Sequence, residues 1–384
     1  MVMKRLLSEQ VLGVALAALV LAACGTTGQS ASSPSPLASP TVVATQGAGF
    51  SPSPSSSPAV ADVRLVIEDF NVPEVRLVRL DATDVATVKG VFAGIAGGQV
   101  IVVNGPILEA INRNGTIKKL GQLAADPSGP GPGTVAVKPD LSQWIYTVAD
   151  AQLTSHIHLG SPSADIVIAS VPSPDGYTFY QAFEWNPSGI YMNKQATGLG
   201  GAGPFLEYHF ALARFDPTTG HVSEVSPECM VEKVLDDGTM ICRRPIPDGR
   251  VEVRSPSGHV NLIQLAAQTG NNANDYRHIE ISPDGTRLIA ARDGAADPAK
   301  STNYQMAVAD LTASSAHALG PLDYVPDTWL PDGRVVADHE CLPVEWGAGP
   351  CDTKLDGTYI FNADGSTHSL FYKLVGGAYV VGYL

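Results

Sequence analysis

Short apolar runs alternate with small polar turns along most of the chain. In ISPDGTRLIAAR, residues 281–292, a Pro-Asp-Gly turn separates two such runs. Proline pre-sets φ at such a turn, aspartate bonds its own backbone, and glycine takes the positive φ that other residues avoid. No window keeps a helical period over a convincing length, so the runs are predicted to be strands joined by hairpins. Without crossover helices, neighbouring strands must be antiparallel.

This turn recurs along the chain at a nearly fixed spacing. Its copies are 43, 48, 49, 47, 48 and 44 residues apart, counted between the third positions Gly98, Leu141, Gly189, Gly238, Gly285, Gly333 and Gly377. Leu141 stands where glycine is expected, which predicts a turn of a different type there. A second hairpin lies between copies, as in VEVRSPSGHVNLIQL, so each unit of about 45 residues holds four strands, the size of one β-propeller blade.

The two ends of the repeat array predict how a ring would close. Residues 75–90 look like the second hairpin of a blade, and residues 371–384 look like a first hairpin that lacks its second. Together they would make one shared blade, and the six complete units bring the number to seven. Pairing of the N- and C-terminal strands would remove exposed sheet edges. The pattern does not place residues 62–74.

With these turns the sequence resembles the TolB-like and WD-repeat-like propellers, whose repeat carries a Pro-Asp-Gly turn ahead of an apolar strand. The copies at Pro283 and Pro331 are full matches, and the resemblance covers roughly residues 62–384. It implies an all-β, seven-bladed β-propeller of four-stranded antiparallel blades. Six or eight blades, or a pair of β-sandwiches, are the alternatives. The fold assigns no function by itself, because propellers serve as enzymes and as binding modules.

The N-terminus has the features of a bacterial lipoprotein signal peptide. Lys4 and Arg5 precede an apolar run over residues 11–23, which is too short to span a bilayer comfortably. The run ends in Leu-Ala-Ala-Cys and resembles the lipobox, with Cys24 as the predicted lipid attachment site. An ordinary cleaved signal peptide is the alternative. Residues 1–23 are therefore predicted to be removed, and residues 24–61 to form a disordered Ser/Pro-rich tether.

Charge excludes one class of partner. The chain has 38 acidic and 24 basic residues and a formal net charge of −14. Its field repels phosphate backbones, so nucleic acid is not an expected partner. We expect a monomer outside the cytoplasm, held at the bacterial membrane or cell surface through lipidated Cys24.

The longest connections are predicted to share one face of the ring. In an up-and-down blade, the first and third turns lie on one face, and the second turn and the link to the next blade lie on the other. AQLTSHIHLGSPSAD, KQATGLGGAGPF, CLPVEWGAGPC and three further long connections all belong to the second group. Rigid scaffolds carry recognition on variable loops, so this face is predicted to bind a ligand. Its candidate residues are His156, His158, Asn271, Asn272, Asp275, Tyr276 and Trp346.

Four cysteines remain once Cys24 is assigned to lipid. An even number in an exported protein favours disulfides, and three pairings are possible. We favour Cys229 with Cys242, across the hairpin at residues 236–238, and Cys341 with Cys351, across a loop. Zinc is the rival for four cysteines, but no C-x-x-C pair is present.

Several motifs for cofactors and metals are incomplete. Residues 198–203 match G-x-G-x-x-G but precede Pro204 and a strand-like run, where a dinucleotide site needs a helix. His156 and His158 could start a metal site, but no third ligand is near in the sequence. His339 is followed by glutamate but lacks the second histidine of H-E-x-x-H. No cofactor, metal or catalytic residue is predicted.

These observations predict an envelope-anchored lipoprotein whose propeller is a non-catalytic binding module for a protein, a glycan or a small ligand. The alternative is an extracytoplasmic hydrolase or lyase that uses carboxylates of the central funnel. Such groups would come from different blades, so sequence spacing cannot show them. A structural envelope component with a stable protein partner is a third hypothesis.

Overall fold

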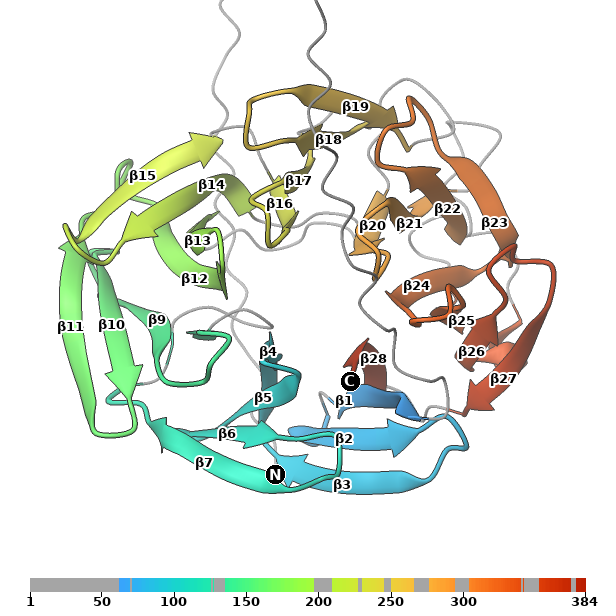
Figure 1. Ribbon diagram of the computed structural model, residues 1–384, viewed down its shortest axis with the longest axis horizontal. Helices are drawn as coiled ribbons and strands as arrows, with labels where there is room; N and C mark the ends of the chain where they lie inside the picture. Colours follow the sequence, from blue (N-terminus) through green and yellow to red (C-terminus); the bar gives the residue numbers. More distant parts are fainter. Residues whose placement is uncertain are drawn as a thin grey trace, which may run out of the picture. The chain divides into compact units, whose positions relative to one another are not determined.

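The computed structural model describes residues 62–69, 71–125, 127, 135–196, 209–226, 230–244, 250–265, 276–293, 304–339, 341, 352–373 and 378–384. These residues form seven four-stranded antiparallel sheets, arranged as blades around a ring (Figure 1). The predicted all-β, seven-bladed propeller is therefore confirmed. In the described part of the chain, no helix is long and apolar enough to cross a membrane.

The four strands of each blade follow one another from the centre of the ring to its outside. In this order, blade 1 contains β28 (Ala378–Tyr383), β1 (Arg64–Asp69), β2 (Glu74–Arg79) and β3 (Asp84–Lys89). Blade 2 contains β4 (Val91–Ala96), β5 (Gln99–Asn104), β6 (Ile107–Ile111) and β7 (Ile117–Gln122). Blade 3 contains β8 (Val135–Val137), β9 (Trp144–Ala149), β10 (Ser155–Ser161) and β11 (Ala164–Val171). Blade 4 contains β12 (Thr178–Asn186), β13 (Gly189–Ala196), β14 (His209–Asp216) and β15 (His221–Ser226).

The last three blades have the same arrangement. Blade 5 contains β16 (Met230–Val234), β17 (Met240–Arg243), β18 (Arg250–Arg254) and β19 (Val260–Gln264). Blade 6 contains β20 (Tyr276–Ile281), β21 (Arg287–Asp293), β22 (Tyr304–Asp310) and β23 (His317–Leu322). Blade 7 contains β24 (Tyr324–Trp329), β25 (Val335–His339), β26 (Gly357–Phe361) and β27 (His368–Tyr372), with a 3-10 turn at Thr353–Leu355.

The apolar core lies between the faces of neighbouring blades. Leu108 of blade 2 packs in one buried cluster with Val135 and Trp144 of blade 3. Some inner strands, such as β24, are buried on both faces, whereas outer strands such as β15 are mostly exposed. Burial on both faces explains the apolar runs of strands such as β1 and β5, and one-sided burial explains the polar positions of the outer strands.

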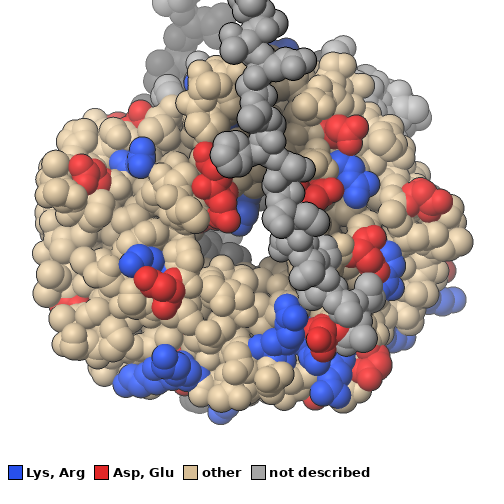
Figure 2. Space-filling view, in the orientation of Figure 1, with Lys and Arg blue, Asp and Glu red and all other residues tan. Residues whose placement is uncertain are grey.

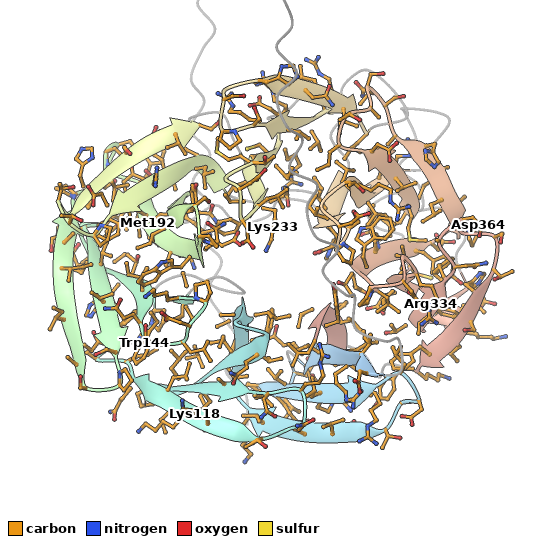
Figure 3. The ribbon with its side chains drawn as sticks, in the orientation of Figure 1. Lys118, Trp144, Met192, Lys233, Arg334 and Asp364 are labelled. Carbon is orange, nitrogen blue, oxygen red and sulfur yellow. The ribbon has the colours of Figure 1, made fainter. Side chains whose placement is uncertain are left out.

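Trp144 fills the space between blades 2 and 3 (Figure 3). Its side chain is fully buried and lies against Gly121 of β7 and Gly160 of β10. A Cβ atom at either glycine would overlap the indole ring. Glycine at these two positions is therefore required by the tryptophan and not by a turn.

The ring closes through blade 1, although not in the predicted proportions. β28 pairs with β1, so the C-terminus supplies one strand and the N-terminus supplies three. The prediction that residues 371–384 form a hairpin was wrong, because the first part belongs to β27 of blade 7. Residues 64–69, within the segment left unplaced, form β1, the second strand of the blade.

The first turn of blade 3 corrects a second expectation. Leu141 adopts a φ of 60°, close to the 68° of Gly285, and each residue donates its N–H to the carbonyl three residues earlier. The turn is therefore of the same type, and the predicted departure was wrong. Asp140 stabilises the turn by accepting the Ser142 N–H and pairing with Lys138. Leucine in this conformation costs about 1 kcal/mol.

Candidate functional site

Three charged side chains occupy equivalent positions on the innermost strands of blades 4, 5 and 6. Glu184, Lys233 and Glu280 each stand five residues before the glycine of their blade's first turn. Each follows a register shift in the pairing of the innermost strand with its neighbour. Such bulges re-aim side chains. Figure 3 places Lys233 at the inner rim of the ring.

Lys233 and Glu184 form an ion pair at this rim. Their Nζ and Oε1 atoms are 3.4 Å apart, and Glu184 Oε2 also accepts the Val234 N–H at 3.3 Å. The Lys233 side chain is 51% exposed, so its ammonium group faces solvent as well as the carboxylate. The pair is locally neutral, and Glu184 is committed to protein partners.

Glu280 differs because its carboxyl group accepts no hydrogen bond from the described residues. Its side chain is part-buried, and burial raises its pKa to about 7, although the Lys233 charge opposes that shift. The pKa of Tyr383 on β28 is also raised, first by burial and then by the charge of Glu280. The charge of Glu280 therefore acts on the phenol of Tyr383. We call Glu184, Lys233, Glu280 and Tyr383 the channel cluster.

Acidic and basic side chains are interspersed on the face seen in Figure 2, which also shows the opening at the centre of the ring. No single sign of charge dominates that view, despite the net charge of −14. Recognition at the opening therefore depends on individual groups such as Glu280 and not on a uniform field.

Glu280 should make stability depend on pH. Because its folded pKa lies above the unfolded value near 4.5, the native state gains stability below pH 4.5 and loses it as pH rises through 7. Glu280→Gln removes this loss. We expect the variant to be more stable than the wild type at pH 8, by about 1–3 kcal/mol, and similar at pH 4.5. Urea unfolding of both proteins across this range measures the difference.

Glu109→Gln on β6 makes the same chemical change away from the channel cluster. The pH dependence of its effect on stability is the baseline of the comparison. A Glu280→Gln effect with the same pH dependence as that of Glu109→Gln would contradict a raised pKa of Glu280.

A groove of about 1020 Å³ lies on the same end of the ring as the first and third turns. It is lined by residues of all four strands of blade 4 and of its first and third turns, from Trp185 on β12 to Ser223 on β15. We call it the blade 4 groove. It begins one residue from Glu184 and crosses the blade from its innermost to its outermost strand.

His156 and His158 both lie on β10, where each bonds a different aspartate. His156 is 3.2 Å from Asp150 Oδ2 and 2.9 Å from Ser170 Oγ. His158 is buried, stacks on Tyr146 and lies 3.0 Å from Asp165. The long connection predicted here therefore contains a strand, and a five-residue turn precedes it. The two histidines are engaged in separate polar networks within blade 3.

The other candidates for the long-loop face cannot be placed as a site. Asn271, Asn272, Asp275 and Trp346 lie outside the described residues, and Tyr276 is the first residue of β20. Binding by the long-loop face stays a prediction. The channel cluster was not predicted from the sequence, although a signal was present: a charged residue stands in three innermost strands at the same distance from the turn glycine.

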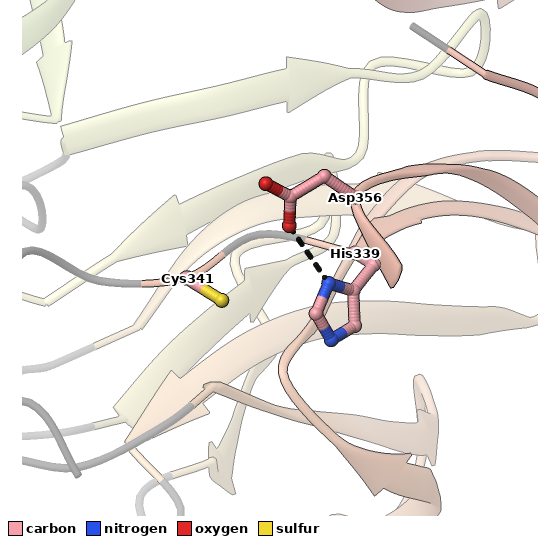
Figure 4. A group of neighbouring side chains, drawn as sticks. All are labelled: His339, Cys341 and Asp356. Atoms are coloured by element: carbon pink, nitrogen blue, oxygen red, sulfur yellow. Dashed lines mark hydrogen bonds and ion pairs between the residues drawn. The ribbon is translucent and has the colours of Figure 1, made fainter. Parts of the chain in front are cut away.

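His339, Cys341 and Asp356 bring three possible metal ligands together at the end of blade 7 (Figure 4). Their ligand atoms lie within 4.8 Å of one another, and His339 Nδ1 is 3.1 Å from Asp356 Oδ1. Cys341 is also one of the predicted disulfide cysteines, and a bridged sulfur cannot act as a thiolate ligand. Its predicted partner Cys351, like Cys229, lies outside the described residues.

No family model and no curated protein matches the chain. Among solved structures, an oligogalacturonate lyase from Vibrio parahaemolyticus is similar, with 14% identity, a TM-score of 0.45 and coverage of 83% of this chain and 89% of that one. TolB from Acinetobacter baumannii has 15% identity, a TM-score of 0.40 and coverage of 79% and 77%. An uncharacterized protein from Listeria monocytogenes has 10% identity, a TM-score of 0.43 and coverage of 75% and 84%. The class of this protein, a seven-bladed β-propeller, rests on its own strand pairings.

Proposed function

We propose that this protein is an envelope-anchored lipoprotein whose propeller binds a ligand without catalysis, at the central opening. The observation that supports this most directly is the carboxyl group of Glu280, which is part-buried in the channel cluster and has no hydrogen-bond partner among the described residues. A ligand can bond to this group without displacing a protein partner. The ligand is a protein, a glycan or a small molecule.

The pairing of Glu184 supports binding over hydrolysis. Glycoside hydrolysis by the usual route needs two carboxyl groups, one as acid and one as base or nucleophile. Glu184 is held by Lys233 and by the Val234 N–H, which leaves one uncommitted carboxyl group in the channel cluster.

The test is a binding screen of the full-length chain in detergent against a glycan panel and an envelope extract. For any ligand captured, the dissociation constant is measured between pH 6 and pH 8 with the wild type, Glu280→Gln and Glu109→Gln. We expect the wild type and Glu109→Gln to share a pH-dependent affinity with a midpoint near 7, and Glu280→Gln to lose that dependence. An unchanged pH profile in Glu280→Gln would place the ligand elsewhere.

A second function is favoured by one observation. A carboxyl group whose pKa is about 7 can both accept and donate a proton at neutral pH, which suits a general acid or base. Lys233 could then stabilise negative charge in a hydrolase or lyase reaction. Turnover of a captured glycan that falls at least 100-fold in Glu280→Gln, while binding persists, would favour the enzyme.

The lipid anchor is proposed from the signal sequence alone. Cys24→Ser removes the only thiol in the Leu-Ala-Ala-Cys motif. We expect cells that express the wild type to incorporate radiolabelled palmitate into this protein, and cells that express the variant to incorporate none, because the variant lacks the thiol that carries the lipid. Two acyl chains would hold the wild type at the membrane. Fractionation should show the variant released from membranes. Equal membrane retention of both proteins would contradict the lipid anchor.

We propose two disulfides together with the lipid anchor. An exported protein enters an oxidising compartment, in which disulfides form and persist. Peptide mapping of the unreduced protein should link Cys229 to Cys242 and Cys341 to Cys351. The register places Val231 opposite Cys242, so the first bridge would join residues that are not directly paired. Free thiols at all four positions, or crossed pairs, would contradict this assignment.

A further inference from the structure

The blade 4 groove contains several hydrogen-bond donors that the protein does not use. The indole N–H of Trp185 and the ring of His221 have no hydrogen-bond partner among the described residues. Arg214 Nη2 donates to the Ser188 carbonyl at 2.9 Å, and this is the one bond that its guanidinium makes to the described chain. Since a guanidinium has five N–H groups, most of its donors are available to a ligand.

The position of Arg214 is set by the first turn of the blade. Its guanidinium lies over Gly189, where an added Cβ atom would come within 2.8 Å of Arg214 Nε. The arginine is thereby held across the groove with its charge near the turn. A planar donor group held in this way is suited to two parallel hydrogen bonds with a carboxylate.

The carboxylate of the groove, that of Asp216, already accepts hydrogen bonds from its own turn. Asp216 accepts the Thr218 N–H and the Thr219 hydroxyl, and these bonds lower its pKa. The ladders of blade 4 use the main-chain groups that face between neighbouring strands. The unused side-chain donors of Trp185, Arg214 and His221 favour a ligand that presents acceptors.

We infer that the blade 4 groove binds an oligosaccharide that carries a carboxylate, with the carboxylate held by Arg214. This inference rests on the proposed role as a binding module, but not on the channel cluster. A peptide that pairs with the free outer edge of β15 is the competing occupant, and Trp185 favours the sugar. Trp185 offers an amphipathic ring and an N–H to sugar hydroxyls, and the groove is long enough to cross four strands.

The experiment compares two probes that differ only in the carboxylate. Calorimetry measures binding of a hyaluronan tetrasaccharide and of its methyl ester to the full-length chain in detergent. We expect the acid to bind at least tenfold more tightly than the ester. Arg214→Ala should weaken binding of the acid by about 10- to 100-fold, the range for a hydrogen bond to a charged group.

Two further variants distinguish binding in the groove from a general effect of charge. Trp185→Phe keeps an aromatic side chain but removes the N–H, and should weaken both probes by a similar factor. Arg334→Ala removes another arginine, in the first turn of blade 7, with the same change in net charge. It should leave binding of the acid unchanged. Thermal unfolding of each variant checks that the fold is retained.

Equal affinity for acid and ester, no binding of the acid, or equal effects of Arg214→Ala and Arg334→Ala would each overturn the inference. If neither probe binds but the screen captures another ligand whose binding depends on Glu280, the propeller is a binding module. Only the inference that the blade 4 groove binds an acidic oligosaccharide is then wrong. If the acid binds through Arg214 and Glu280→Gln has no effect on binding, the inference about the blade 4 groove is supported and the proposed binding site at the channel cluster is wrong.

Discussion

Removal of residues 378–384 is expected to abolish cooperative folding of the propeller. This truncation deletes β28, the innermost strand of blade 1 and the strand that closes the ring. It removes the buried side chains of Val380 and Leu384 and exposes Leu65 and Ile67 of β1. Each of these apolar groups contributes about 1.5–3 kcal/mol when buried. The sum approaches the whole stability of a typical domain. Circular dichroism with urea unfolding would show no cooperative transition.

A circular permutant is the matched control for this truncation. Leu384 exchanges two backbone hydrogen bonds with Arg64, at 2.8 and 3.0 Å, and the bond from the Leu384 N–H corresponds to the one that the Leu330 N–H donates to the Arg334 carbonyl across the first turn of blade 7. The end of β28 and the start of β1 therefore flank the position that Pro331-Asp332-Gly333 occupies in blade 7. Joining Leu384 to Arg64 by Pro-Asp-Gly, and opening the chain between Lys373 and Ala378, should preserve folding. If the truncated chain also unfolds cooperatively with unchanged stability, β28 does not close the ring.

Gly160→Ala is expected to destabilise the propeller by about 3 kcal/mol, the upper range for overpacking a rigid core. The added methyl group would overlap the indole of Trp144, and the pairing of Gly160 with Trp144 holds the two backbones together. The ring cannot move away easily, because Gly121 lies against its other part. Urea unfolding at neutral pH measures the loss.

A double-mutant cycle tests whether the overlap causes this loss. In a Trp144→Leu background, the same Gly160→Ala change should cost less than about 1 kcal/mol, since the smaller side chain leaves room. The single change Trp144→Leu is itself destabilising, because it leaves a cavity between blades 2 and 3. An equal cost of Gly160→Ala in both backgrounds would show that strand conformation, and not contact with the indole, requires this glycine.

The blade pattern could be predicted because its signal is local. A Pro-Asp-Gly turn specifies its own backbone within four residues, so its repetition gave the number and the length of the blades. The assignment of β1 could not be predicted in the same way. No turn residues precede it, since the neighbouring strand β28 comes from the other end of the chain. The turn at Leu141 was predicted wrongly for a different reason. The surrounding hydrogen bonds impose on leucine the positive φ that glycine usually adopts.

The channel cluster was not predicted because its members are far apart in the sequence. Glu184 and Glu280 come from blades 4 and 6, and Tyr383, on which the charge of Glu280 acts, comes from the strand that closes the ring. Sequence spacing alone cannot reveal such convergence. The repeat itself supplies a usable rule, since a charged residue five positions before a turn glycine stands on an innermost strand beside a register shift.

Carbon-13 NMR of the glutamate side-chain carboxyl carbons tests the proposed channel site most directly. The full-length chain and Glu280→Gln are titrated between pH 4 and pH 9 in detergent. We predict one resonance with a midpoint near pH 7 in the wild type, and its absence from Glu280→Gln. Titration of every glutamate below about pH 5.5 would contradict a part-buried, uncommitted carboxyl group at the central opening.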